Sequence, residues 1–214
     1  MSGIARQRLL IFPCNGNGRE AVDALGEADE LVGFVDDAAD KHGCGPYGFP
    51  VRGRSAFVEF ADARVLAVPG APSSYMRRRE IIEGLGIAAS RFATVVHPSA
   101  RVSRFATIGH NVLIMAGVVI TSNAVIGNHV CILPNSVVHH DTSIGDWTLI
   151  GSGVTVAGGC TVGRNCYIGS ASSIINGVSI GALALVGLGA TVIATVLPGV
   201  KVAGSPARQI GTVA

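Results

Sequence analysis

Residues 108–150 read IGHNVLIMAGVVITSNAVIGNHVCILPNSVVHHDTSIGDWTLI. In this stretch a Val or Ile returns at every sixth position, and the series runs without interruption from residue 96 to residue 192. The fourth residue after each of these positions is always small: Ala, Val, Ser, Thr or Cys. A fixed six-residue period is the signature of a parallel β-helix, in which each unit is one short strand and a corner.

Three such units predict a triangular coil of eighteen residues, with the aliphatic side chains inside and the small ones near the corners. Coils stack at the usual strand spacing, so the repeat predicts a prism about 27 Å long. Helices are excluded, because the period fits neither 3.6 nor 3.5 residues and the segment is rich in Val, Ile, Thr and Gly. A second period, Gly at 109, 127, 145, 163 and 181, predicts either positive φ or a close approach of chain.

Residues 1–92 follow a different pattern. Buried strands are expected at residues 9–12, 31–35 and 65–68, and helices at 19–25 and 75–85. Strands that alternate with helices predict a parallel α/β unit. Ligands of such units bind beyond the carboxyl ends of the strands.

Two segments of this first domain stand at those strand ends. The turn after the first strand contains Asn15, Gly16, Asn17 and Gly18, whose amides could meet a phosphate at a helix N-terminus. The second strand ends in Asp36 and Asp37, which could accept hydrogen bonds from ribose or sugar hydroxyls. Glycines in a turn also serve ordinary turn chemistry, so the pattern by itself leaves nucleotide binding open.

The composition sets further limits. The chain has 214 residues and a net charge of +2, which argues against nucleic acid as a main partner. No apolar run is long enough to span a membrane, and no signal peptide is recognisable, so we expect a cytoplasmic protein without a membrane partner. The five cysteines are an odd number. Cys160 and Cys166 fall on the small inward position, which predicts packed thiols rather than a metal site.

The junction of the two regions reads FATVVHPSA at residues 92–100, and the repeat closes with VAGSPAR at residues 202–208. Together with the β-α-β start, the GFVDD strand end at residues 33–37 and the hexapeptides, this order resembles one family over residues 8–210. The chain is similar to the bacterial sugar-nucleotide acetyltransferases, typified by the bacillosamine and perosamine N-acetyltransferases and the sialic-acid O-acetyltransferase-like proteins.

The resemblance implies a Rossmann-like domain over residues 1–92 that binds the nucleotide-sugar. It implies a left-handed parallel β-helix with a short tail over residues 93–214, although the general rule for parallel crossovers is right-handed. It also implies a homotrimer with acetyl-CoA in the groove between two β-helices. The resemblance further implies a nucleotide-linked amino sugar as acceptor, used for bacterial surface polysaccharide or glycan; transfer to a sugar hydroxyl remains open.

The family's His-Asp pair matches His140 and Asp141. Imidazole titrates near neutrality, so it can take the proton that an attacking amine must lose. Asp141 can orient the ring, although an adjacent residue could also point elsewhere. Gly158 lies one coil further, and in the family the matching amide faces the thioester oxygen. From spacing alone, His140 could equally be a solvated corner residue.

The remaining expected contacts come from the resemblance as well. For the cofactor they are Gly158, Asn176, Leu188 and Arg208. For the nucleotide-sugar they are Asn15, Gly16, Asn17, Gly18, Asp36, Asp37 and His139. No metal is expected. The family's first turn has four glycines and then His, whereas this chain keeps only Gly16 and has Asn17 in place of the histidine, so its nucleotide contacts stay open.

Two other functions are compatible with parts of the sequence. A zinc lyase of the β-helical carbonic anhydrase type needs three converging histidines. His110, His129 and His140 are expected at three different corners, with His110 and His129 exposed or at an interface. A non-catalytic nucleotide-binding scaffold would explain the altered turn. We also expect residues 77–79, three arginines, to form a solvated helix face, and Trp147 to lie at an interface.

Overall fold

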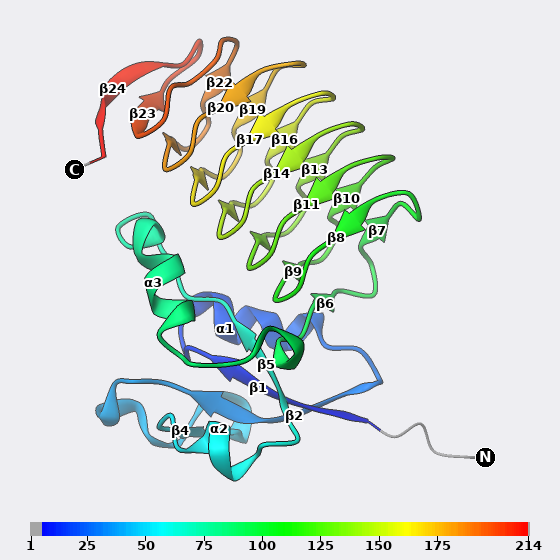
Figure 1. The fold of residues 1–214 in the computed structure, drawn as a ribbon, viewed down its shortest axis with the longest axis vertical. Helices are drawn as coiled ribbons and strands as arrows, with labels where there is room; N and C mark the ends of the chain where they lie inside the picture. Colours follow the sequence, from blue (N-terminus) through cyan, green and yellow to red (C-terminus); the bar gives the residue numbers. More distant parts are fainter. Residues whose placement is uncertain (1–5, 214) are drawn as a thin grey trace.

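The structure is a computed structural model that describes residues 6–213. The first part of the chain forms a five-stranded sheet in the order β3-β4-β2-β1-β5, parallel except for the antiparallel pair β3 and β4 (Figure 1). Its strands are β1 (Gln7–Phe12), β2 (Asp29–Val35), β3 (Gly43–Cys44), β4 (Pro50–Arg52) and β5 (Arg64–Ala67). The three expected strands are therefore present, and the short β3 and β4 were not foreseen.

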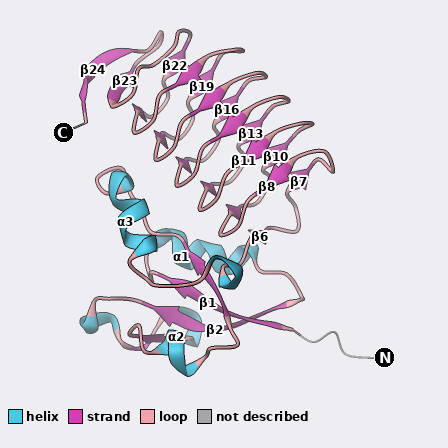
Figure 2. Ribbon diagram, viewed as in Figure 1, coloured by secondary structure: helices cyan, strands magenta, loops and turns pink. Residues whose placement is uncertain are grey.

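The helices of this region are short (Figure 2). They are α1 (Gly16–Glu20), α2 (Ala56–Glu59) and α3 (Arg78–Glu83), with 3-10 turns at Ala21–Ala24, Ala39–Lys41, Pro46–Gly48, Tyr75–Arg77 and Ala89–Arg91. The helix expected at residues 19–25 instead begins at Gly16, because the Asn15 side chain caps it by accepting the Gly18 amide at 2.8 Å. The helix expected at 75–85 is a 3-10 turn followed by α3.

The repeat forms a triangular prism, as the hexapeptide period predicts, and each of its three faces is a sheet of parallel strands from successive coils. The architecture fits a left-handed parallel β-helix. The first face holds β7 (Arg101–Val102), β10 (Val119–Ile120), β13 (Val137–Val138), β16 (Thr155–Val156), β19 (Ser173–Ile174) and β22 (Thr191–Val192). The second face holds β8 (Thr107–Ile108), β11 (Val125–Ile126), β14 (Ser143–Ile144), β17 (Thr161–Val162) and β20 (Ser179–Ile180). The third face holds β6 (Val95–Val96), β9 (Leu113–Ile114), β12 (Cys131–Ile132), β15 (Leu149–Ile150), β18 (Tyr167–Ile168), β21 (Leu185–Val186), β23 (Val200–Ala203) and β24 (Arg208–Thr212).

The small inward position does more than fill space. Ser136, Thr142 and Thr148 each donate from the hydroxyl to a corner carbonyl fifteen residues later, as Thr148 does to Gly163 at 2.9 Å, whereas Ser172 donates to the Gly169 carbonyl of its own coil. Cys166 makes the same contact with the Gly181 carbonyl at 3.2 Å, and Cys160 with Ile175 at 3.1 Å. The two cysteines are therefore packed thiols that take the place of serine or threonine, as expected.

Every sixth residue from position 111 to position 189 has a positive φ, so each corner contains one left-handed residue. Asn and Gly hold most of these positions, because they adopt this conformation at little cost. The positive φ considered for Gly109 and its eighteen-residue series is wrong. The alternative, close approach, is confirmed: a Cβ on Gly109 would lie 2.7 Å from the Gly127 carbonyl oxygen of the next coil.

The N-terminal region packs on the third face of the prism. The outward side chains of that face, such as Leu113 and Leu149, are buried in one cluster with Leu9 and Ile11 of β1. The edge between the first and second faces lies opposite the covered face and stays open. No helix of the described part of the chain is long and apolar enough to cross a membrane.

Candidate active site

His140 and Asp141 form a corner between β13 and β14, on the edge where the first face meets the second. We call this the open edge, and its successive corners are residues 122–123, 140–141, 158–159 and 176–177. The side chains of His140 and Asp141 are 60% and 56% exposed. The pair is therefore accessible to a ligand that lies along the edge.

The two side chains meet although they are neighbours in sequence. Asp141 has φ 58°, and this left-handed turn brings its Oδ2 to 2.7 Å from His140 Nδ1. The hydrogen bond from His140, with a second from Asn123, holds the pKa of Asp141 below its usual value. A carboxylate at Nδ1 makes this nitrogen the donor, which leaves the Nε2 lone pair free to accept a proton.

Gly158 forms the floor beneath the imidazole. A Cβ placed on Gly158 would lie 2.6 Å from Cε1 and 2.7 Å from Nε2 of His140, so only glycine lets the ring occupy this position. Within residues 6–213 no acceptor receives the Gly158 amide, whereas the amide of His110 at another edge is bound by the Asn128 side chain. The open edge therefore combines a base with the amide of a buried glycine, one coil later, that has no acceptor among these residues.

The other expected contacts are only partly gathered at this edge. Asn176 is an exposed corner residue one coil beyond Gly158, and His139 is half-buried beside His140. Leu188 is 70% exposed on a different edge, between β21 and β22, and so is not beside His140 within one chain. Arg208 lines a cavity of about 290 Å³ near the C-terminal end, together with Ala194, the open-edge corner that follows Asn176.

A further polar residue at the open edge was not foreseen. Asn123 lies one coil before Asp141 and donates from Nδ2 to its Oδ1 at 3.1 Å. The signal was present in the sequence, because the two residues are eighteen positions apart and occupy the same corner of successive coils.

The edge between the second and third faces, which we call the docked edge, binds the N-terminal region. Its left-handed corner residues are Asn111, His129, Trp147, Asn165 and Leu183. Each of the five makes at least one hydrogen bond to residues 67–78. This column therefore fixes the N-terminal region on the prism.

Arg78 corrects the expectation of a solvated arginine helix face. Its side chain is fully buried and donates to the carbonyls of Pro69, His129 and Trp147. Burial lowers its pKa to about 10, so it still carries its charge at neutral pH. No sequence pattern indicates this burial, because it depends on how the two regions meet.

The expected positions of two histidines are also corrected. His129, expected to be exposed or at an interface, is buried where the N-terminal region contacts the prism, with its ring stacked on Trp147. Burial, followed by the nearby His110 and Arg78, lowers the pKa of His129 to about 4. The rings of His110 and His129 lie 4.8 Å apart on the same edge, and only His140 is on another. In the described part of the chain no three His, Cys, Asp or Glu side chains are grouped to hold a metal ion.

The carboxyl ends of β1, β2 and β5 surround a cavity of about 290 Å³, lined by Asn15, Asp36 and Asp37 among others. Asp36 is buried and accepts from the Cys14 and Ala38 amides and from Lys41. Asp37 pairs with Arg54, and this hydrogen bond lowers the pKa of Asp37.

The turn beside this cavity is held largely by its own side chains. Gly16 is exposed. The amide of the buried Gly18 donates to the Asn15 side chain, and Asn17 Nδ2 donates to the Gly70 carbonyl at 3.3 Å. The turn thus offers fewer free amides to a phosphate than a run of glycines would.

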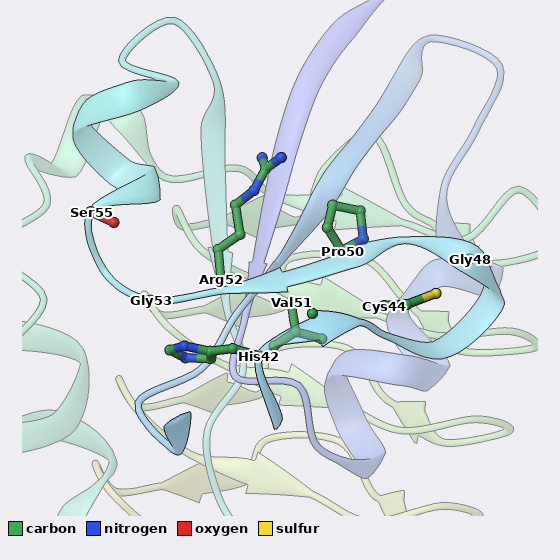
Figure 3. Close-up of a pocket in the computed structure, with 9 residues that line it drawn as sticks. His42, Cys44, Gly48, Pro50, Val51, Arg52, Gly53 and Ser55 are labelled. Atoms are coloured by element: carbon green, nitrogen blue, oxygen red, sulfur yellow. The ribbon is translucent and has the colours of Figure 1, made fainter. Parts of the chain in front are cut away.

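A larger hollow of about 570 Å³ lies along β3 and β4 (Figure 3). His42, Cys44, Val51 and Arg52 are among its lining residues. The His42 Nε2 is already bonded to the Asp36 carbonyl at 2.8 Å. This hollow therefore lacks a base with an adjacent carboxylate, which the open edge provides.

Residues 123–158 match the family model "Bacterial transferase hexapeptide (six repeats)". The acetyltransferase domain of PglB from Neisseria gonorrhoeae, in complex with acetyl coenzyme A, is 26% identical, with a TM-score of 0.83 over 96% of this chain and 100% of that chain. PerB from Caulobacter crescentus, in complex with CoA and GDP-perosamine, is 27% identical, with a TM-score of 0.83 over 96% and 97%.

WeeI from Acinetobacter baumannii is 25% identical, with a TM-score of 0.79 over 96% and 100% of the two chains. No curated protein sequence matches the chain significantly. The matches confirm the resemblance to sugar N-acetyltransferases of the hexapeptide-repeat class, and with it the expectation of an acyltransferase enzyme.

Proposed function

We propose that this chain transfers the acetyl group of acetyl-CoA to the amino group of a nucleotide-linked amino sugar, with His140 as the general base. The observation that carries the proposal is the His140–Asp141 pair, held over Gly158 on the open edge. The similar PglB domain is in complex with acetyl-CoA, and the similar PerB is in complex with CoA and GDP-perosamine, which supports both substrates.

The reaction follows from this geometry. The sugar amine attacks the thioester carbonyl while His140 Nε2 takes the proton that the nitrogen loses. Asp141, bonded to Nδ1, stabilises the imidazolium that results. The Gly158 amide stabilises the negative oxygen of the tetrahedral intermediate. When the intermediate collapses, the C–S bond breaks, the imidazolium returns its proton to the leaving sulfur, and the acetamide and free CoA are released.

We assign acetyl-CoA to the open edge. Gly158 and Asn176 succeed His140 along it, and Arg208 lines the cavity at its far end, where it could meet a CoA phosphate. Leu188 lies on another edge of the same chain, so a contact from it with the same cofactor requires a second chain.

We assign the nucleotide-sugar to the N-terminal region, taken as a Rossmann-like domain over residues 1–92 before a β-helix domain over residues 93–214. Asn15, Asp36 and Asp37 line its cavity, and Gly16, Asn17 and Gly18 follow Asn15 in the turn that begins α1. Because Asp36 is already held by three bonds, Asp37 is the more accessible acceptor for a hydroxyl or base. His139 is the remaining candidate contact at the open edge.

We infer that the active unit is a homotrimer with sites between subunits. The N-terminal region covers the third face of the prism, and His140 lies on the edge opposite that face. The cavity and the imidazole of one chain are thus separated by the width of the prism. Exposed apolar side chains near the open edge (Phe105, Ile175 and Ile193) support a contact with a neighbouring copy. We place the enzyme in the cytoplasm, in the synthesis of a surface polysaccharide or glycan.

A thiol-release assay tests the proposal. Purified protein is given acetyl-CoA with each of a panel of nucleotide-linked amino sugars and their hydroxyl analogues. We expect turnover with at least one amino sugar, and a loss of about 10²–10⁴-fold in His140→Ala, the usual worth of general-base assistance. Unchanged turnover in His140→Ala would remove the mechanism, and turnover only with hydroxyl analogues would change the acceptor.

A further inference from the structure

The Asp141 carboxylate has a different partner on each oxygen. Oδ2 accepts from His140 Nδ1 at 2.7 Å, and Oδ1 accepts from Asn123 Nδ2 at 3.1 Å. An ionised carboxylate can only accept hydrogen bonds, so the NH₂ group of Asn123, and not its carbonyl, must face it. The three side chains form a line that begins at Asn123 and ends at the imidazole.

The position of Asn123 is set by the coil itself. Asn123 and Asp141 have φ values of 58° each and occupy the same left-handed corner of successive coils. The next two residues in this column are Gly159 and Gly177, which carry no side chain. Polar side chains in this column therefore meet only at the coil that carries His140 and the coil before it.

A single hydrogen bond would leave the carboxylate free to rotate. The last torsion of an aspartate is broad, and Asp141 is more than half exposed, so packing does not hold it. A second bond on the other oxygen fixes the plane of the carboxylate, and through Nδ1 it fixes the plane and tautomer of the imidazole.

We propose that Asn123 is a positioning residue for acyl transfer, which acts on His140 through Asp141. This inference rests on the proposed function, because it needs His140 to be the base. It adds a residue of the preceding coil to the catalytic apparatus, and it implies that the coil stacking itself aligns the base.

The test compares Asn123→Gly with Ala171→Gly. Glycine already occupies the Asn123 corner in the two later coils, so the exchange removes the amide without straining the backbone. Ala171 is an exposed left-handed corner residue, with φ 59°, on a different edge, so it controls for the new glycine. We expect kcat to fall about fivefold in Asn123→Gly, the rate equivalent of one hydrogen bond of typical net strength. The KM values and melting temperature should match those of Ala171→Gly.

A double mutant shows whether Asn123 acts through Asp141. If it does, Asn123→Gly lowers kcat in the wild-type background but causes no further loss in Asp141→Asn. Asn123→Asp should be slower still, because it replaces the donor with a like charge. An unchanged kcat in Asn123→Gly would overturn the inference, and so would a full loss that persists in Asp141→Asn, since Asn123 would then contact substrate directly.

The same experiment separates this inference from the proposed function. If His140→Ala is inactive and Asn123→Gly is fully active, only the proposed role of Asn123 is rejected. An active His140→Ala removes the base itself, and the positioning role is lost with it.

Discussion

Replacing Gly158 with Ala should abolish most activity without harming the fold. The new Cβ would lie 2.6–2.7 Å from ring atoms of His140, whereas unstrained contacts are about 3.5–4.0 Å. The imidazole must therefore move by about 1 Å, and a displacement of this size costs about 10²-fold in rate. We expect kcat in the thiol-release assay to fall by this factor and to approach that of His140→Ala.

The thermal stability of Gly158→Ala, unlike its activity, should not fall. Gly158 does not need a positive φ, and the His140 ring is exposed enough to turn away. The alanine should therefore leave the melting temperature unchanged or raise it slightly, because it stiffens the unfolded chain.

The adjacent Gly159 is the matched control. It has φ +69° and no atom within 4 Å of its added Cβ, so Gly159→Ala should lose about 1 kcal/mol of stability and keep its activity. If Gly158→Ala retains near wild-type kcat, the ring does not act from its position over Gly158.

Three further predictions concern stability. Arg78→Met removes the donor from three buried carbonyls and should lower the free energy of unfolding in urea by about 3 kcal/mol; a change below 1 kcal/mol would contradict the role of Arg78 at the docked edge. The pKa of His129 is about 4 in the folded state against 6.5 when unfolded, so the unfolded chain takes up the proton first as pH falls. Stability should be complete above pH 6.5 and decline toward pH 4 by about 3 kcal/mol, a loss that His129→Asn should abolish in chemical melts at each pH. Cys166→Ser should stay within about 1 kcal/mol of wild type in thermal melts, because its hydroxyl can repeat the Thr148 contact, whereas Cys166→Leu should overpack the corner and lose more; equal losses in the two would contradict this substitution of thiol for hydroxyl.

Much of the prism could be predicted because its period is local. One Val or Ile every six residues is enough to specify strand, corner and stacking, whatever the rest of the chain does. The left-handed corner position could not be predicted from the sequence. Asn and Gly would have indicated it, but His129, Trp147 and Leu183 interrupt their series. The regular Gly109 series does not mark this corner; it marks close approach between coils.

The docked edge was not predictable from local pattern. Arg78 lies in an arginine run that is typical of a solvated helix, and only the docking of residues 67–78 on the prism buries it. His129 is buried for the same reason. The cap formed by Asn15 was likewise unforeseen, because it depends on the turn geometry at the end of β1.

The candidate site lies between these cases. The resemblance pointed to His140 and Asp141, but neighbouring residues in a strand point apart, and their contact depends on the φ of Asp141. The role of Gly158 as the floor of the ring needed the stacked coil. Asn123 could have been found by stepping back eighteen residues from Asp141.

A complementation experiment tests the shared site most directly. His140→Ala chains keep the N-terminal cavity, and Ala71→Trp chains, with the cavity filled, keep the imidazole. Each variant alone should be inactive. If a trimeric ring joins the cavity of one chain to the His140 of the next, random mixing at equal concentration should restore about a quarter of the wild-type activity per site. No recovery in verified mixed oligomers would place both groups in one chain and contradict the account.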